Sequence, residues 1–271
     1  MKKIIWLASY PKCGNTYLRL FLSHYICNEE NSLDFGLLSN IQKFEAKQTF
    51  EKVLDLNLLK NKFVYYKYCI DVQNKLINST SKEYLIFKTH HFFGQFNGFD
   101  FTNENNTLFF IYLVRDPREV LVSYAKHSGI TIDEMLKFFI NDKAINREDF
   151  ETKLNWKQNY KSWKSFKSVP SLFIKYEDLI SSPFEVFSSV VFMFSRYTKI
   201  QYNEEKIKKI IKFLKFQNLQ KEEKKVGFNE SIGNKFFRSG KKDSWKKILN
   251  RKQIIIIEKN FSIEMKELKY I

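Results

Sequence analysis

The chain has 271 residues, of which 44% are apolar and 17% aromatic, and its 46 Lys and Arg against 30 Asp and Glu give a formal net charge of +16. This apolar content supports a sizeable core and excludes a largely disordered chain, while only 8 Gly and 4 Pro exclude collagen-like and Pro/Gly-rich classes. The three cysteines, Cys13, Cys27 and Cys69, are neither even in number nor at metal-ligand spacing, so neither a disulfide scaffold nor a zinc site is expected.

Two apolar stretches near the ends of the chain are too short to cross a membrane. The apolar run over residues 4–8 ends before Pro11, and no signal-peptide cleavage sequence follows it. The apolar run over residues 254–257 is bounded by Gln253 and Glu258. A membrane-spanning helix requires on the order of 20 apolar residues. The sequence therefore predicts a soluble, cytoplasmic protein without a membrane span.

The first forty residues predict a strand, a tight loop and a helix. The strand covers residues 4–10, the loop 11–15 and the helix 16–27, which Thr16 or Asn15 can cap. Further predicted elements follow in chain order: strands over 85–90 and 107–114, a helix over 118–127, an amphipathic helix over 150–167, a strand over 171–176 and a helix over 183–194.

Strands that alternate with helices pair in parallel, so we predict an α/β fold with a central parallel sheet flanked by helices. No repeat, low-complexity stretch or linker divides the sequence, and residues 1–271 are expected to form a single domain. Ligands of such sheets bind at the carboxyl ends of the strands. The loops that leave those ends are the first places to look for a site.

The loop over residues 9–16 has the composition of an anion site. Its backbone N–H groups and the positive end of the helix dipole converge, and Lys12 adds a full charge. It is not a Walker A motif, because Lys12 precedes Gly14 and the upstream glycine is absent. An ordinary strand–helix turn with an incidental lysine is the alternative for this segment alone.

Residues 10–17, Tyr-Pro-Lys-Cys-Gly-Asn-Thr-Tyr, resemble the 5′-phosphosulfate-binding loop of the sulfotransferases that use 3′-phosphoadenosine 5′-phosphosulfate (PAPS). In the usual form of that loop, Cys13 is a serine and Tyr17 a tryptophan. The resemblance implies that Lys12 is catalytic, because it stabilises the charge that grows on the oxygen between sulfur and the departing 5′-phosphate. It also implies that this loop binds the donor through Lys12, Cys13, Gly14, Asn15, Thr16 and Tyr17.

Residues 115–124, Arg-Asp-Pro-Arg-Glu-Val-Leu-Val-Ser-Tyr, follow an apolar strand and are similar to the family's 3′-phosphate-binding element. The resemblance implies that Arg115 and Ser123 hold the 3′-phosphate. Physically, Arg115 offers a guanidinium fork at the end of the strand, and Ser123 adds a hydroxyl two helical turns later. Arg118 is either part of this site or a residue of the helix surface.

Residues 237–245, Phe-Arg-Ser-Gly-Lys-Lys-Asp-Ser-Trp, resemble a mobile loop of the family that closes over the donor. The resemblance assigns Arg238, Ser239 and Gly240 to the 3′-phosphate. Ser239 stands where a lysine is common, and Lys241 or Lys242 is the candidate to supply the missing charge.

Two shorter matches concern the adenine ring. Tyr176, in Lys-Tyr-Glu-Asp-Leu, resembles the tyrosine whose hydroxyl bonds the purine. Phe216 resembles the phenylalanine that helps to sandwich the ring, with Tyr17 on the opposite face. An aromatic residue in a helical pattern is more often part of a core, and the order of the matches along the chain favours the binding role.

The segment Lys88-Thr89-His90-His91 ends a predicted strand and contains the candidate base. Because side chains alternate across a strand, only one of the two histidines readily faces the cleft. The family's base lies two residues after a lysine, which selects His90 as catalytic. A neutral imidazole can take the proton from an acceptor hydroxyl; a core histidine is the alternative.

The ordered motifs between residues 10 and 245 identify the chain as a member of the PAPS-dependent sulfotransferases, of the cytosolic type and with their P-loop-like fold. The implied reaction moves a sulfuryl group from PAPS to a hydroxyl or amine of a small-molecule or glycan acceptor and releases 3′,5′-adenosine bisphosphate. No metal is implied. The acceptor and the oligomeric state are open.

Two alternatives compete with this interpretation. A P-loop kinase of small molecules or nucleotides would have a similar fold, but the Walker A spacing is missing. A basic nucleic-acid-binding protein is compatible with the charge of +16, but no reader motif is recognisable. We therefore expect no nucleic-acid partner.

Overall fold

The computed structural model describes residues 2–27, 32–55, 64–143, 145–146, 152–230, 235–237, 240 and 243–271. The chain divides into two compact units, and each is described by itself. Unit 1 comprises residues 1–11, 41–114 and 140–173, and unit 2 comprises residues 12–40, 115–139 and 174–271. The single domain expected over residues 1–271 stays a prediction.

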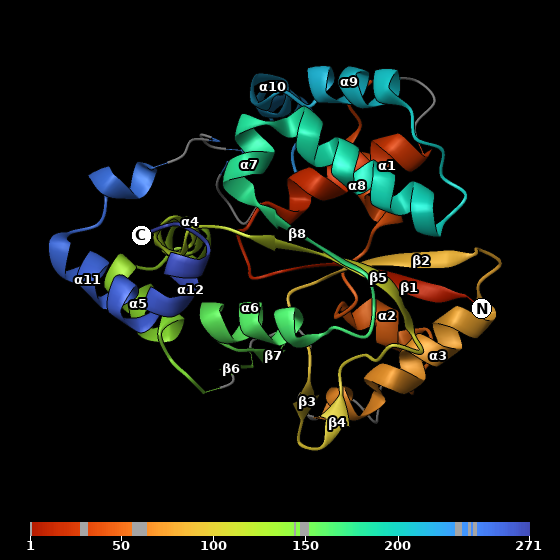
Figure 1. Ribbon diagram of the computed structural model, residues 1–271, viewed down its shortest axis with the longest axis horizontal. Helices are drawn as coiled ribbons and strands as arrows, with labels where there is room; N and C mark the ends of the chain where they lie inside the picture. Colours follow the sequence, from red (N-terminus) through yellow and green to blue (C-terminus); the bar gives the residue numbers. More distant parts are fainter. Residues whose placement is uncertain are drawn as a thin grey trace. The chain divides into compact units, whose positions relative to one another are not determined.

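Unit 1 is built on a four-stranded sheet with the order β2-β1-β5-β8 (Figure 1). Its strands are β1 (Lys3–Ser9), β2 (Tyr84–Thr89), β5 (Thr107–Val114) and β8 (Ser171–Lys175), of which β8 continues two residues past the end of the unit. β1 pairs in parallel with β2 and β5, so the carboxyl ends of these three strands lie at one edge. The near-continuous burial of β1 and β5 is typical of parallel sheets.

Aromatic side chains fill the core of unit 1. The Trp6 ring lies 5.0 Å from the ring of Phe101 and 5.2 Å from that of Phe44, and its Nε1 donates to Thr107 Oγ1. Two helices, α3 (Cys69–Ser79) and α6 (Trp156–Ser165), pack against β1. The smaller elements of the unit are α2 (Lys47–Glu51), η3 (Val64–Tyr68), the antiparallel pair β3 (Gln95–Phe96) and β4 (Phe99–Asp100), and the pair β6 (Ile145–Asn146) and β7 (Thr152–Lys153).

The helix predicted over 150–167 is shorter in the structure, where α6 begins at Trp156. Asn155 and Gln158 form a capping box, in which each side chain accepts a hydrogen bond from the backbone N–H of the other residue. Upstream, residues 152–153 are a strand, and residues 147–151 lie outside the described part. The predicted helix therefore begins too early, because the capping box of Asn155 and Gln158 fixes its start at Trp156.

Unit 2 is helical, and the helices predicted over 16–27, 118–127 and 183–194 are confirmed with small changes at their ends (Figure 1). One group contains α1 (Asn15–Cys27), η1 (Phe35–Asn40), α7 (Tyr176–Ser181), α8 (Pro183–Tyr197), α9 (Glu204–Phe213) and α10 (Phe216–Val226). A second group packs around α4 (Pro117–Ser128) and contains α5 (Ile132–Phe139), η4 (Ser244–Lys247), α11 (Arg251–Asn260) and α12 (Ser262–Glu267).

The start of α4 explains why Arg115 stands immediately outside a helix. Asp116 is the N-cap and accepts from the backbone N–H of Arg118, and Pro117 occupies the first turn. Gly129, with φ 66°, ends the helix in the left-handed conformation. The cap therefore fixes Arg115 in the short loop that joins the end of β5 to α4.

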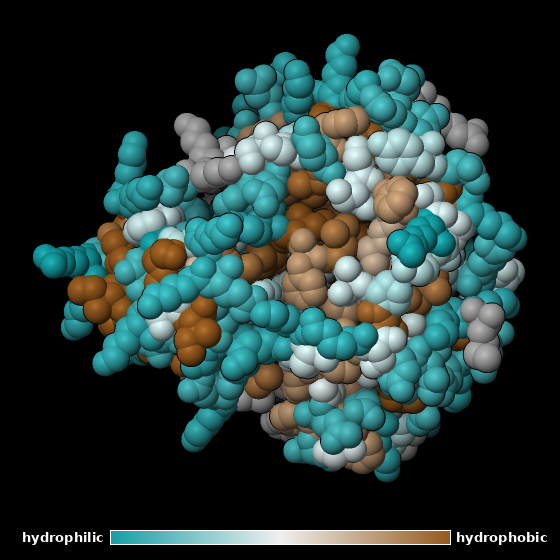
Figure 2. All heavy atoms as spheres, in the orientation of Figure 1, coloured by the Kyte–Doolittle hydropathy of each residue, from teal (hydrophilic) through white to brown (hydrophobic). Residues whose placement is uncertain are grey.

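The surface over α9 and α10 is mainly hydrophilic (Figure 2), which agrees with the exposed lysines of these two helices. Several large apolar side chains are also exposed on unit 2, among them Phe138, Ile255 and Ile263. Within the part of the chain that the structure describes, no helix is both long enough and apolar enough to cross a membrane.

Candidate active site

The first predicted loop leads directly into α1. The carbonyl of Gly14 accepts from the backbone N–H of Tyr17 (3.0 Å) and of Leu18 (3.3 Å), so Gly14 occupies the cap position. The expectation that Thr16 or Asn15 caps this helix is wrong, because both lie inside its first turn. The hydroxyl of Thr16 donates instead to Glu230 Oε2 at 2.9 Å.

Gly14 is the point where this loop meets Tyr176. Its φ of +93° lies in the region that favours glycine, and a Cβ built there would stand 2.6 Å from Cδ2 of the Tyr176 ring. Two independent constraints therefore require glycine. The ring of the predicted adenine-binding tyrosine packs on the backbone of the predicted phosphosulfate loop.

Lys12 has an unusual backbone for a residue with a side chain, with φ at 68°. Its carbonyl accepts from Arg115 Nη1 at 3.2 Å, and its ammonium lies 4.6 Å from the centroid of the Phe236 ring. The neighbouring Cys13 is fully buried, and burial raises the pKa of its thiol above the ordinary value, so the thiol adds no negative charge to the loop.

Arg115 brings three of the predicted segments together within unit 2. Besides the Lys12 carbonyl, its guanidinium contacts Glu119 Oε2 at 3.3 Å and stacks on Tyr176, with Cζ 4.1 Å from the ring centroid. The side chain is largely buried. Ser123, the second predicted ligand of the 3′-phosphate, lies on α4 and is also buried. The roles of these residues in donor binding stay predictions.

Glu119 also belongs to this site, although the sequence analysis did not predict it. Its carboxylate accepts from Arg115 and also from Ser244 Oγ (2.9 Å) and the backbone N–H of Trp245 (3.1 Å). Glu119 thus connects α4 to η4, the end of the third predicted motif. Its position four residues after Arg115, the spacing of helical ion pairs, was the available signal.

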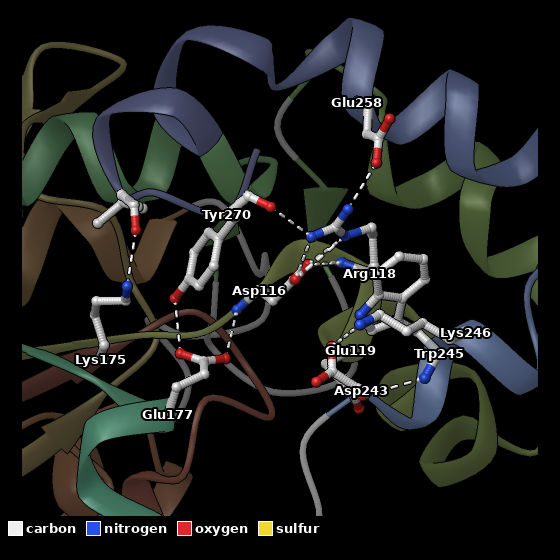
Figure 3. A network of polar contacts seen from close by, with 11 residues as sticks. Asp116, Arg118, Glu119, Lys175, Glu177, Asp243, Trp245, Lys246, Glu258 and Tyr270 are labelled. Carbon is white, nitrogen blue, oxygen red and sulfur yellow. Dashed lines mark hydrogen bonds and ion pairs between the residues drawn. The ribbon is translucent and has the colours of Figure 1, made fainter. Parts of the chain in front are cut away.

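Arg118 belongs neither to a solvated helix surface nor to the contacts around Arg115. Its guanidinium bonds the Asp116 carboxylate, Glu258 Oε1 at 2.6 Å and the Tyr270 carbonyl at 2.9 Å, and it stacks on the Trp245 ring (Figure 3). Burial lowers the pKa of Arg118, but the hydrogen bonds and charges of the two carboxylates outweigh burial and raise it. Arg118 therefore anchors α11 and residues 268–271 to α4, and the surface interpretation is wrong.

Glu177 ties Tyr176 and its helix to the same network. It accepts from the backbone N–H of Asp116 (3.1 Å) and from the Tyr270 hydroxyl (2.9 Å). Burial raises the pKa of Glu177. Lys175, one residue before Tyr176, donates to the Leu268 carbonyl at 2.8 Å (Figure 3).

The third motif is described only in part. Gly240 has φ 56°, and a Cβ built there would stand 2.7 Å from Cδ2 of Phe216, so this glycine packs on the predicted adenine-sandwiching ring. Arg238, Ser239, Lys241 and Lys242 lie outside the described residues. Tyr17 packs on Phe187 with 5.6 Å between ring centroids, and burial raises the pKa of its hydroxyl to about 12. The sandwich between Tyr17 and Phe216 stays a prediction.

His90 lies in unit 1, just after β2. Its Nδ1 is 2.8 Å from the carbonyl oxygen of Ser9, the last residue of β1, and its own carbonyl accepts from Asn159 Nδ2 at 3.0 Å. A carbonyl oxygen only accepts, so in the neutral form of the ring this contact places the hydrogen on Nδ1 and the lone pair on Nε2. The role of His90 as the general base stays a prediction.

His91 has a different environment and is fully buried. Its Nε2 lies 2.7 Å from the Tyr65 hydroxyl, its ring centroid is 4.8 Å from that of Phe101, and its carbonyl accepts from Trp163 Nε1. His91 is a histidine of the aromatic core. Across the described residues, no three His, Cys, Asp or Glu side chains are grouped to hold a metal ion.

Comparisons with known proteins place the chain in a family. The family model of the sulfotransferase domain matches residues 2–269. Luciferin sulfotransferase of Photinus pyralis is 23% identical over 234 residues, which are 80% of this chain and 56% of that protein. The match thus spans little more than half the length of that relative.

Solved structures share the fold. Mouse sulfotransferase SULT7A1 complexed with PAP has a TM-score of 0.63 at 18% identity, over 97% of this chain and 84% of that one. Retinol dehydratase in complex with androsterone and inactive cofactor PAP has a TM-score of 0.63 at 17% identity, over 97% and 80%. The chain belongs to the sulfotransferase family, and the α/β fold expected from the sequence is confirmed.

The contact between Gly14 and Tyr176 gives a stability prediction. Gly14→Ala adds a Cβ against the ring as well as the strain of a positive φ, so we expect it to lower the free energy of unfolding by about 2–4 kcal/mol in urea titrations. Gly129→Ala is the matched control, because Gly129 also has a positive φ but a Cβ there meets nothing within 4 Å. We expect the control to cost about 1–2 kcal/mol. Equal costs would show that the ring does not rest on Gly14.

Proposed function

We propose that this protein transfers a sulfuryl group from PAPS to a hydroxyl or amine of a small-molecule or glycan acceptor and releases 3′,5′-adenosine bisphosphate. The observation that carries the proposal is the position of Arg115, whose guanidinium contacts the Lys12 carbonyl and the Tyr176 ring. Three segments that resemble donor-binding motifs thus meet within unit 2. Membership of the sulfotransferase family supports the same activity.

PAPS is the donor in this proposal. SULT7A1 and the retinol dehydratase were both solved with PAP, the product of such a donor. The residues described fit an anionic adenosine ligand, because Lys12 and Arg115 are cations beside the start of α1 and Tyr176 presents an aromatic ring next to them. We assign the 5′ group to residues 12–17 and the 3′-phosphate to Arg115 and Ser123. Arg238, Ser239 and Gly240 complete the donor site, with Tyr176, Phe216 and Tyr17 around the adenine.

The reaction needs little covalent chemistry from the protein. The acceptor oxygen or nitrogen attacks sulfur in line, and the bond from sulfur to the bridging oxygen breaks, so that its electron pair stays on the departing 5′-phosphate. Lys12 stabilises this growing charge. Nε2 of His90 takes the proton from the acceptor, while its Nδ1–H stays on the Ser9 carbonyl.

The names of similar proteins mention luciferin, retinol and androsterone, which supports a small-molecule acceptor. A cytoplasmic location and the lack of a nucleic-acid partner remain part of the proposal. No observation favours the kinase alternative, whose Walker A spacing is missing.

Removal of the Lys12 charge tests the catalytic assignment. Lys12→Met keeps an unbranched side chain that is one atom shorter and carries no charge, and we expect turnover to fall about 10²–10³-fold, the typical cost of one preorganised electrostatic donor. Lys164→Met is the matched control, because Lys164 also lies over an aromatic ring, that of Tyr160, but belongs to α6. Initial rates with saturating PAPS are the measurement. Turnover of Lys12→Met within a few fold of wild type would contradict the assignment.

The adjacent histidines provide an internal comparison for the base. We expect His90→Ala to lower the sulfation rate by about 10²–10⁴-fold with near-normal donor affinity, because a general base acts on the acceptor. His91→Ala should mainly lower the free energy of unfolding, because its ring is packed in the core. Rates, donor affinity and urea titrations of both variants decide the matter. If the His91→Ala protein folded but were inactive while the His90→Ala protein stayed active, the general base would be His91 and not His90.

A further inference from the structure

A carboxylate of the chain itself stands at the first turns of α1. Glu230 Oε2 accepts from the Thr16 hydroxyl at 2.9 Å, and Glu230 Oε1 forms an ion pair with Arg19 Nη1 at 2.5 Å. Glu230 is 214 residues from Thr16 in sequence. All three residues belong to unit 2. One anionic group therefore bridges a hydroxyl and a guanidinium on neighbouring turns of the same helix.

Arg19 is a buried cation to which the resemblance gives no role. Its relative exposure is 4%, and besides the ion pair its Nη2 donates to the Leu38 carbonyl at 3.3 Å. Side chains on a helix tilt toward its N-terminus, so a long side chain at position 19 reaches back over the turn that holds Thr16. Spacing of three residues puts both side chains on one face.

The chemistry of this pair is that of an anion site. A hydroxyl donor, a guanidinium fork and the positive end of a helix dipole all favour a negatively charged oxygen ligand. The oxygens of a phosphate or sulfate group are spaced much like the two oxygens of a carboxylate. A ligand of that kind can thus take the contacts that Glu230 makes here.

We propose that Arg19 is a further donor-binding residue, which holds the 5′ end of PAPS together with Thr16, and that Glu230 is an intramolecular competitor for the same position. The inference rests on the proposed function, because that function assigns Thr16 to the donor. When the donor binds, the Glu230 carboxylate leaves Thr16 and Arg19, and the donor's oxygens replace it. Arg19 exchanges one anion for another and stays paired in both states.

The competition has a measurable consequence. Part of the free energy of donor binding is spent on displacing the carboxylate, which lowers the apparent affinity. Removal of the Glu230 charge should therefore tighten binding of any ligand with a 5′ anionic group. The affinity for a ligand without that group should not change when the Glu230 charge is removed.

The experiment compares two ligands by calorimetry at fixed salt: adenosine 3′,5′-bisphosphate, and adenosine 3′-monophosphate, which lacks the 5′ group. We expect Glu230→Gln to bind the bisphosphate about three- to tenfold more tightly than wild type, with little change for the monophosphate. Glu205→Gln is the control for net charge, because Glu205 is an exposed glutamate of α9. It should change neither affinity.

Arg19 is tested in the Glu230→Gln background, where the competing negative charge is already gone. There Arg19→Gln should weaken the bisphosphate about tenfold or more and leave the monophosphate nearly unchanged, and Arg19→Lys should restore part of the loss. An arginine that only pairs with Glu230 would show no effect in this background. Because Arg19 is buried, urea titrations accompany the affinities, and Glu230→Gln alone still decides the competition.

The outcomes separate this inference from the proposed function. A wild-type protein that does not bind the bisphosphate would overturn both. Normal binding of the bisphosphate, with unchanged affinity in Glu230→Gln, would overturn the competition and leave the proposed function standing. Normal binding with no effect of Arg19→Gln in the Glu230→Gln background would remove Arg19 from the site.

Discussion

The structure of unit 2 depends on how one buried guanidinium is satisfied. Arg115 is largely excluded from water, and a buried cation without partners would cost several kcal/mol. The Lys12 carbonyl, the Glu119 carboxylate and the Tyr176 ring provide the compensation, and each comes from a different local structure. The loop before α1, the first turn of α4 and the start of α7 are therefore held in one arrangement by a shared requirement.

The same contacts explain why strained backbone persists in the first loop. Lys12 adopts a left-handed conformation that costs on the order of 1–3 kcal/mol for a residue with a side chain. Its carbonyl is bonded by Arg115, and the adjacent Gly14 is covered by the Tyr176 ring. These contacts thus hold the Lys12 backbone in its strained conformation. Strained backbone of this kind is common at binding and catalytic sites.

The features that depend on residues close together in the chain were predictable from the sequence. The strands β1, β2 and β5 were found because each is a continuous apolar run, and the loops after them followed from motifs that lie within a few residues. Long-range partners were not predictable in this way. Arg118 was misjudged because Glu258 and Tyr270 lie 140 and 152 residues away, and the pairing of Thr16 with Glu230 has no local signal. The start of α6 was missed although Asn155 and Gln158 carry a recognisable capping pattern.

The central claim is that the cations and rings around Arg115 form a site for an adenosine ligand with both a 3′- and a 5′-anionic group. Calorimetric titration of the wild-type protein with 3′,5′-adenosine bisphosphate, ATP and duplex DNA at one salt concentration tests it most directly. The account predicts that the bisphosphate binds more tightly than either alternative by orders of magnitude. Binding of ATP or DNA as tight as that of the bisphosphate would contradict it.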